Sequence, residues 1–169
     1  MANEYDIMVE DGVEMPISLE EIEADCDLVL SEEGINRPCA VSISVVSDKE
    51  IQKINFEWRE KNSPTDVISL EVERPDDPDL APDELCELGD IILAPDFISR
   101  QAKEYGTTCA DEFRLMLVHA MLHLLGYDHI EDEEAELMEA REDSLVSLLA
   151  TDAKLDPVVL TRHHEGIDE

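Results

Sequence analysis

Hydrophobic residues alternate with polar residues along parts of the chain, a pattern typical of β-strands. Residues 39–46 alternate valine and isoleucine with serine, which predicts a strand with one buried face. Residues 67–72 predict a second strand, and the apolar run 88–93 predicts a third at a central position of a sheet. A further short strand is expected within residues 5–13. These segments together predict a small sheet of about four strands.

Elsewhere, apolar residues recur every three or four positions, which is typical of amphipathic helices. Ser18 and Glu21 form a capping box at the start of the first helix, and Gly126 offers an end to the fourth. Inward-facing positions include Trp58 in the second helix and Leu137 in the last. The predicted helices cover residues 18–33, 49–60, 95–105, 108–125 (beginning at Thr108 or Asp111) and 131–150.

The order of these elements predicts one α+β domain of α/β type. In it, a small mixed sheet packs with about five helices, and the helix that carries most of the histidines is central. The chain of 169 residues is long enough for one hydrophobic core. We expect the domain to span residues 1–155 and a polar tail to follow at 156–169. The proline- and aspartate-rich segment 73–87 is expected to be a loop.

The chain is strongly acidic, with 44 acidic and 12 basic residues and a formal net charge of −32. Such a surface repels nucleic acid and anionic membranes on average, and argues against a polyanionic substrate. The distribution is uneven, since residues 1–36 contain twelve acidic residues and no Lys or Arg, whereas five basic residues fall within residues 37–61. The sequence is therefore compatible with a local basic patch on an acidic body.

The sequence contains neither a membrane span nor a signal peptide. No apolar run approaches the ~18 residues that a transmembrane helix needs, and no basic segment followed by an apolar one stands at the N-terminus. We therefore expect a cytoplasmic protein with no membrane partner. The four cysteines are scattered without a CxxC motif and are interpreted as small buried residues rather than metal ligands.

Residues 119–129 hold three of the five histidines and decide the functional interpretation. His119 and His123 are spaced i, i+4 among strong helix formers, so both imidazoles lie on one helix face. A turn at Gly126 would bring His129 back towards them. A buried helix that happens to carry histidines would explain one of them. Three at this spacing favour a divalent transition-metal site that keeps an open position for water.

The HxxxH spacing invites comparison with HExxH metalloproteases, in which a glutamate beside the first histidine acts as the base. Ala120 occupies that position here, so a protease would lack its general base unless another carboxylate supplied it. Asp128, next to His129, is a candidate for orienting a metal ligand or a metal-bound water. The same residue is equally compatible with a turn that follows Gly126.

Motifs spread over residues 40–130 match one known family in the same order along the chain. The segment 119–129 has the form HxxxHLxGYDH, and Asn55 with Arg59 precedes residues 65–69 (TDVIS). Further along, residues 88–91 read LGDI. Jointly these motifs resemble the YbeY family, the metal-dependent endoribonucleases also called rRNA maturation factors.

The chain departs from the family pattern at two places. Ala120 stands where the family usually has glycine, a small-for-small change on a helix. Leu70 and Glu71 stand where the family usually has Phe-Pro after the TDVIS serine. The second departure changes the loop beyond the strand, and with it the way in which substrate is held there.

The resemblance implies one zinc ion per chain, bound by His119, His123 and His129, although three imidazoles would also accept Ni²⁺ or Co²⁺. It implies cleavage of single-stranded RNA, processing of rRNA ends (the 3′ end of 16S rRNA) and a role in ribosome quality control. It also implies that Arg59 and His119 are essential to catalysis.

Elementary chemistry is consistent with these implied roles. Zinc lowers the pKa of a bound water to ~7, which supplies hydroxide for attack on a phosphodiester. The planar guanidinium of Arg59 suits a bidentate grip on phosphate, and Lys61 could add a charge beside it. From the residue alone, Arg59 could equally be a surface cation paired with a nearby acid. The match to the family favours phosphate binding.

Two other functions stay open at this point: a metallohydrolase that acts on peptides or small substrates, and a non-catalytic ribosome-assembly factor with a structural metal. A fourth protein ligand would close the metal site and exclude both enzymes. Because a protein of this charge should bind free RNA weakly, we expect it to meet its rRNA precursor on the 30S ribosomal subunit. A basic ribosomal protein or a GTPase would deliver it there.

Overall fold

The computed structural model describes residues 2–128 and 131–149, and within these ranges four strands and five helices form. The prediction of an α+β domain is confirmed, and most element boundaries lie within a few residues of the expected ones. In chain order the elements are β1 (Glu4–Val9), α1 (Leu19–Glu32), β2 (Cys39–Val45), α2 (Asp48–Arg59), β3 (Val67–Glu71), β4 (Cys86–Leu93), α3 (Pro95–Tyr105), α4 (Cys109–Leu124) and α5 (Asp132–Val146).

The strands form one mixed sheet in the order β1-β2-β4-β3. β1, β2 and β4 run parallel, whereas β3 pairs antiparallel with β4. The register between β2 and β4 shifts near Gly89, whose φ is +145°. A Cβ atom there would lie 2.0 Å from the Leu70 carbonyl oxygen, so only glycine fits where β4 passes β3 this closely.

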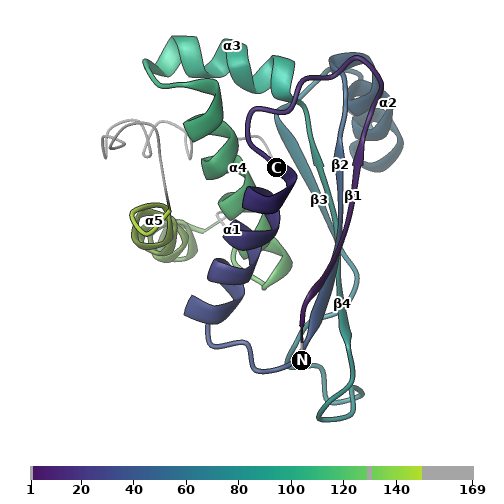
Figure 1. The fold of residues 1–169 in the computed structure, drawn as a ribbon, viewed down its shortest axis with the longest axis vertical. Coiled ribbons are helices and arrows are strands. Elements are labelled where there is room, and N and C mark those ends of the chain that lie inside the picture. Colours follow the sequence, from purple (N-terminus) through teal and green to yellow (C-terminus); the bar gives the residue numbers. More distant parts are fainter. Residues whose placement is uncertain (1, 129–130, 150–169) are drawn as a thin grey trace.

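Helices cover both faces of the sheet. Figure 1 shows α1, α4 and α5 on one side and α2 on the other, with α3 at one end of the sheet. The main hydrophobic core fills the side of α1 and α4, and a smaller core of five buried residues lies beneath α2. Along β3, Val67 belongs to the main core and Ile68 to the smaller one. Because side chains alternate along a strand, Ser69 and Glu71 face the same side as Val67, towards α4.

Helix α4 is the centre of the molecule. Every residue from Asp111 to Leu122 is buried. The helices α1, α3 and α5 contact it, as do the strands β3 and β4. A helix that is covered on all sides needs no polar face, which explains its nearly continuous apolar sequence. The predicted central position of the histidine-bearing helix is confirmed.

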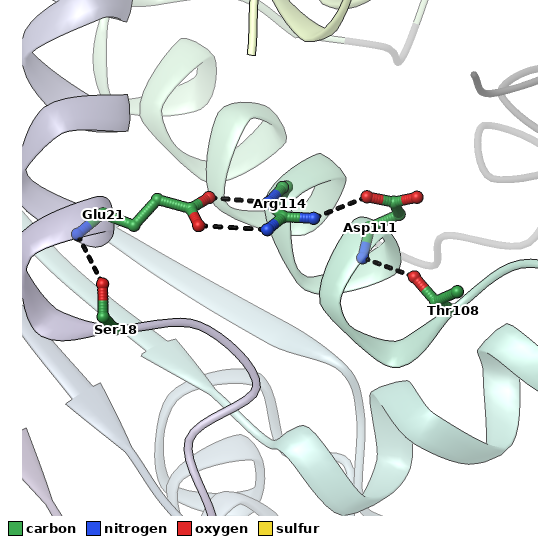
Figure 2. A network of polar contacts seen from close by, with 5 residues as sticks. All are labelled: Ser18, Glu21, Thr108, Asp111 and Arg114. Carbon is green, nitrogen blue, oxygen red and sulfur yellow. Dashed lines mark hydrogen bonds and ion pairs between the residues drawn. The ribbon is translucent and has the colours of Figure 1, made fainter. Parts of the chain in front are cut away.

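A buried ion-pair network fixes the N-terminal end of α4 against α1. Figure 2 shows Arg114 of α4 between Glu21 of α1 and Asp111 of its own helix. The Arg114 guanidinium donates to both Glu21 oxygens, at 2.6 and 3.0 Å, and to Asp111 Oδ1 at 2.6 Å. Hydrogen bonding to Arg114 lowers the pKa of Glu21. The Ser18 and Thr108 hydroxyls accept from backbone N–H groups of the same network and cap the two helices.

The predictions that Trp58 and Leu137 face the core are wrong. Trp58 of α2 is 64% exposed and Leu137 of α5 is 57% exposed. The small core under α2 receives Ile51, with Ile54 packed against it, and does not reach the last turn of the helix where Trp58 lies. The outer side of α5 likewise faces away from α4, so its apolar positions are only partly covered.

The remaining organisation agrees with expectation or falls outside the described residues. Segment 73–85 contains turns but no helix or strand, as predicted. The expected polar tail at 156–169, together with the end of the expected domain at residue 155, lies outside the described residues. Among the helices that are described, none is both long and apolar enough to cross a membrane.

Candidate metal and active site

The last turns of α4 bring His119 and His123 together. His119 is completely buried and His123 is half-buried, one turn nearer the surface. Their ring centroids are 4.6 Å apart with planes at 81°, and their Nε2 atoms lie 3.1 Å from each other. The i, i+4 spacing therefore places both imidazoles on one helix face, as predicted.

Hydrogen bonds at the other ring nitrogens fix the tautomers. His123 Nδ1 lies 2.9 Å from the Tyr127 carbonyl oxygen, which can only accept, so this nitrogen carries the proton. His119 Nδ1 contacts the Glu142 carboxylate from α5, and an ionised carboxylate again makes that nitrogen the donor. In the neutral rings both Nε2 atoms then present lone pairs to the same point.

This arrangement fits a metal ion. Two lone pairs 3.1 Å apart repel each other unless a cation lies between them. Two nitrogen ligands on one tetrahedral zinc, each bonded at ~2.0–2.1 Å, are separated by ~3.3 Å, close to the separation found here. Glu142 and the Tyr127 carbonyl are the outer partners that metal-binding histidines usually have, because such partners fix the tautomer and raise the basicity of the ligand.

The third predicted ligand, His129, lies outside the described residues. Within residues 2–128 and 131–149, no group of three or more His, Cys, Asp or Glu side chains gathers in metal-binding geometry. The described part of the site therefore consists of two imidazoles and their partners. The place of the third ligand stays a prediction.

His123 and Asp128 line one pocket of about 260 Å³. It lies where the C-terminal end of α4 meets β3, and Asp128 is half-buried on its wall. Asp128 thus lies beside His123, and its orienting role stays a prediction. The other lining residues are Ser69, Glu71, Arg74, Leu124, Gly126 and Tyr127.

Arg59 and Lys61 line a different pocket, of about 300 Å³. The C-terminal end of α2, the turn before β3 and one side of α3 form its walls. Both predicted phosphate-binding residues therefore lie together. The pocket is mixed in charge, because Asp66 and Glu104 also line it. Asp66 has a structural role there, since its Oδ1 accepts from the Val67 N–H at 2.7 Å where β3 begins.

The two pockets lie at opposite ends of β3 and have no lining residue in common among those described. One ends at Asp66, just before the strand, and the other begins at Ser69. Three residues of extended strand span roughly 10 Å. Arg59 and His123 therefore lie in separate pockets, one towards each end of the strand.

A buried carboxylate lies near Asp66, one of the residues that line the Arg59 pocket. Glu112 of α4 is completely buried. Its pKa is raised to about 8, mainly by burial and to a smaller extent by the nearby Asp66 carboxylate. Desolvation disfavours the ionised form, and a neighbouring negative charge adds to the effect. Glu112 is therefore protonated near neutral pH.

Two residues of the site escaped prediction from the sequence. Glu142 lies at an inward position of α5, between the buried Met138 and Leu145, so a glutamate within an apolar stripe was the available signal. Arg74 lies three residues after Glu71, the end of β3, and nothing in the local sequence pattern marks it.

Comparison with known proteins decides the family. The sequence model of the family described as Endoribonuclease YbeY matches residues 10–150. The chain belongs to the YbeY endoribonuclease family. The motif resemblance in residues 40–130 is thereby confirmed, and it extends over most of the chain.

Relatives agree with this family assignment. An Endoribonuclease YbeY of Francisella philomiragia is 37% identical over 138 residues, which cover 80% of this chain and 85% of the relative. An Endoribonuclease YbeY of Francisella tularensis is 39% identical over 139 residues, which cover 80% of each chain. The solution structure of TM1509 from Thermotoga maritima has a similar fold, with a TM-score of 0.60 and 25% identity over 85% of this chain and 87% of that one. As a YbeY family member, this chain has an endoribonuclease role.

Proposed function

We propose that this chain is a zinc-dependent, single-strand-specific endoribonuclease that processes rRNA ends, including the 3′ end of 16S rRNA, and acts in ribosome quality control. One observation carries the proposal. Two imidazoles turn their Nε2 atoms towards each other, 3.1 Å apart, beside a pocket in a member of an endoribonuclease family.

The metal would be held by His119 and His123, together with His129. When bound, zinc supplies Lewis acidity at a phosphodiester and an activated water near neutral pH. Glu142 and the Tyr127 carbonyl keep the Nδ1 protons in place, so that each Nε2 remains available as a ligand.

The other residues would bind and orient the RNA. Arg59 and Lys61 would hold one RNA phosphate in their own pocket. The RNA chain would then run alongside β3 towards the histidines. Asp128, on the wall of the pocket with His123, is placed to accept a hydrogen bond from a water molecule or from the substrate there.

The decisive experiment measures zinc content and cleavage of an rRNA precursor fragment in parallel. We expect one zinc per chain, cleavage of single-stranded but not duplex regions, and loss of activity with a chelator. His119→Ala should abolish zinc binding and cleavage together. Arg59→Ala should keep its zinc and lower kcat/KM by roughly 10- to 100-fold. Lys53→Ala, an exposed change on the same helix as Arg59, is the control and should cleave normally.

Each alternative function has its own outcome in this experiment. A chain that binds zinc but leaves RNA intact would be an assembly factor with a structural metal, and the nuclease proposal would be wrong. Cleavage of peptides instead of RNA would indicate the metallohydrolase. Normal cleavage by Arg59→Ala would remove the phosphate-binding role from Arg59.

We also propose that the protein meets its RNA on the 30S subunit, brought there by a basic ribosomal protein or a GTPase. A net charge of −32 should make binding of bare RNA weak at physiological salt. Fluorescence anisotropy with a labelled single-stranded RNA tests this, and we expect a dissociation constant above ~1 μM, within the range of non-specific nucleic-acid binding. Nanomolar binding of bare RNA would contradict the need for a partner.

A further inference from the structure

A cationic side chain that the proposed mechanism does not use lies at the histidine pocket. Arg74 lines this pocket with His123 and Asp128, and it is the one Lys or Arg among the described lining residues. A chain with 12 basic residues against 44 acidic ones offers few cations to a phosphate. Arg74 is therefore one of the few cations in this chain that could attract a phosphate.

The guanidinium of Arg74 is held in one orientation by hydrogen bonds. Its Nε and Nη2 atoms both donate to the carboxylate of Glu71, the last residue of β3, with Nη2 2.9 Å from Oε2. The backbone around it is also held, since Glu73 N–H donates to the Glu87 carbonyl and Asp77 N–H donates to the Arg74 carbonyl. This two-point grip fixes the plane of the guanidinium.

The opposite edge of the same guanidinium reaches the turn after α4. Gly126 has a φ of +106°, and a Cβ atom there would lie 2.5 Å from Arg74 Nη1. Glycine therefore lets the cation lie directly over the turn between His123 and Asp128. Nη1 makes no hydrogen bond to the described residues, so its donors are available to a ligand in the pocket.

We propose that Arg74 is a phosphate-binding residue of the histidine pocket, where it holds the RNA phosphate nearest His123. Arg59 would hold a second phosphate at the other end of β3. In this arrangement Glu71 orients Arg74 but also competes with the substrate for its charge. The inference rests on the proposed function, because it identifies the RNA phosphate as the anion that Arg74 receives.

A purely structural role for Arg74 makes a different prediction. If the ion pair only clamps β3 to the turn at Gly126, then Arg74→Ala and Glu71→Gln break the same clamp and should have the same effect. If Arg74 binds phosphate, the two substitutions should act in opposite directions, because one removes the cation and the other removes its competitor.

The experiment measures binding of zinc-loaded protein to a labelled single-stranded oligodeoxyuridylate, which offers the same phosphates as RNA without being an endoribonuclease substrate. We expect Arg74→Ala to weaken binding roughly 10-fold and to reduce the slope of log K against log salt by ~1. Glu71→Gln should tighten binding by roughly 3-fold. Zinc affinity should stay within about 2-fold of wild type in both variants, because Arg74 and Glu71 pair with each other and neither supports a histidine ring as Glu142 does.

Matched controls separate local from general charge effects. Arg100→Ala removes an arginine from another exposed ion pair, with Asp48, and should leave binding unchanged. Glu20→Gln removes an exposed carboxylate from α1 and should change binding far less than Glu71→Gln.

Two results would overturn the assignment of Arg74: binding by Arg74→Ala that equals binding by Arg100→Ala, or effects of equal sign in Arg74→Ala and Glu71→Gln. Failure of the proposed function gives a different result. In that case wild-type protein does not cleave RNA, whereas the opposite effects on oligonucleotide binding would still identify an anion site at Arg74.

Discussion

At the scale of single residues, the two described histidines differ in how their outer nitrogens are held. His123 donates to a carbonyl four residues away, so its orientation follows from the local turn. His119 contacts Glu142, 23 residues away on another helix, so its orientation depends on the packing of α5 against α4. In the proposed metal site, the strength of His119 as a ligand would thus depend on a tertiary contact.

We predict that Glu142→Gln lowers zinc affinity by ~10- to 100-fold, because an uncharged amide no longer fixes and polarises the His119 ring. Competition with a chromophoric chelator measures the affinity. Glu136→Gln, exposed on the same helix, is the control. Unchanged zinc affinity in Glu142→Gln would show that Glu142 only fills space.

Some residues of the site were predictable from the sequence, and others were not. The spacing of His119 and His123 was enough to predict convergent imidazoles, because i, i+4 geometry is a local property of a helix. Motif similarity selected Arg59, its position next to His129 selected Asp128, and both line pockets. Nothing local selected Arg74, since its place beside Gly126 arises from two segments 52 residues apart in the sequence.

At the scale of elements, α4 is a buried helix that carries charge at one end. The ends and the apolar run of this helix were predictable from the sequence. Thr108, one of the two residues at which the helix was expected to begin, is its N-cap. The partner of Arg114 was not readable, because Glu21 lies on α1 and meets Arg114 only when both helices pack on the sheet.

Removal of Arg114 should be costly. Arg114→Ala would leave the fully buried Asp111 and the partly buried Glu21 without their guanidinium partner, so we expect the free energy of unfolding to fall by about 3–5 kcal/mol. Urea denaturation measures the change. Arg100→Ala breaks an exposed pair and should cost less than about 1 kcal/mol. A similar small loss in Arg114→Ala would mean that water replaces the guanidinium.

At the scale of the whole molecule, charge opposes both compaction and RNA binding. A formal net charge of −32 repels itself as well as a polyanion. Burial of particular carboxylates adds a desolvation cost to this charge repulsion. It raises the pKa of Asp25 to about 7 with a contribution from Glu21, and raises the pKa of Glu112 to about 8.

Stability should therefore decrease between pH 5 and pH 8. An unfolded glutamate loses its proton near pH ~4.3, whereas folded Glu112 keeps it until about pH 8, so the folded state binds more protons across this interval. Under these conditions the free energy of unfolding falls as pH rises, and the loss is complete above the folded pKa.

The variant Glu112→Gln isolates this contribution. Relative to wild type, we expect it to gain on the order of 4 kcal/mol in unfolding free energy between pH 5 and pH 8.5, because the amide cannot ionise. Denaturation at the two pH values measures the difference. Identical pH dependence in the two proteins would show that Glu112 ionises normally in the fold.

The sequence by itself determined the strands, the helices and their caps, and the pairing of His119 with His123. These features depend on backbone hydrogen bonding and side-chain periodicity over a few residues. Tertiary structure alone decided that Glu142 supports His119, that Arg74 lies over Gly126, and that Arg59 occupies a separate pocket. Such contacts join residues distant in the chain, so they exist only after the sheet and helices have packed.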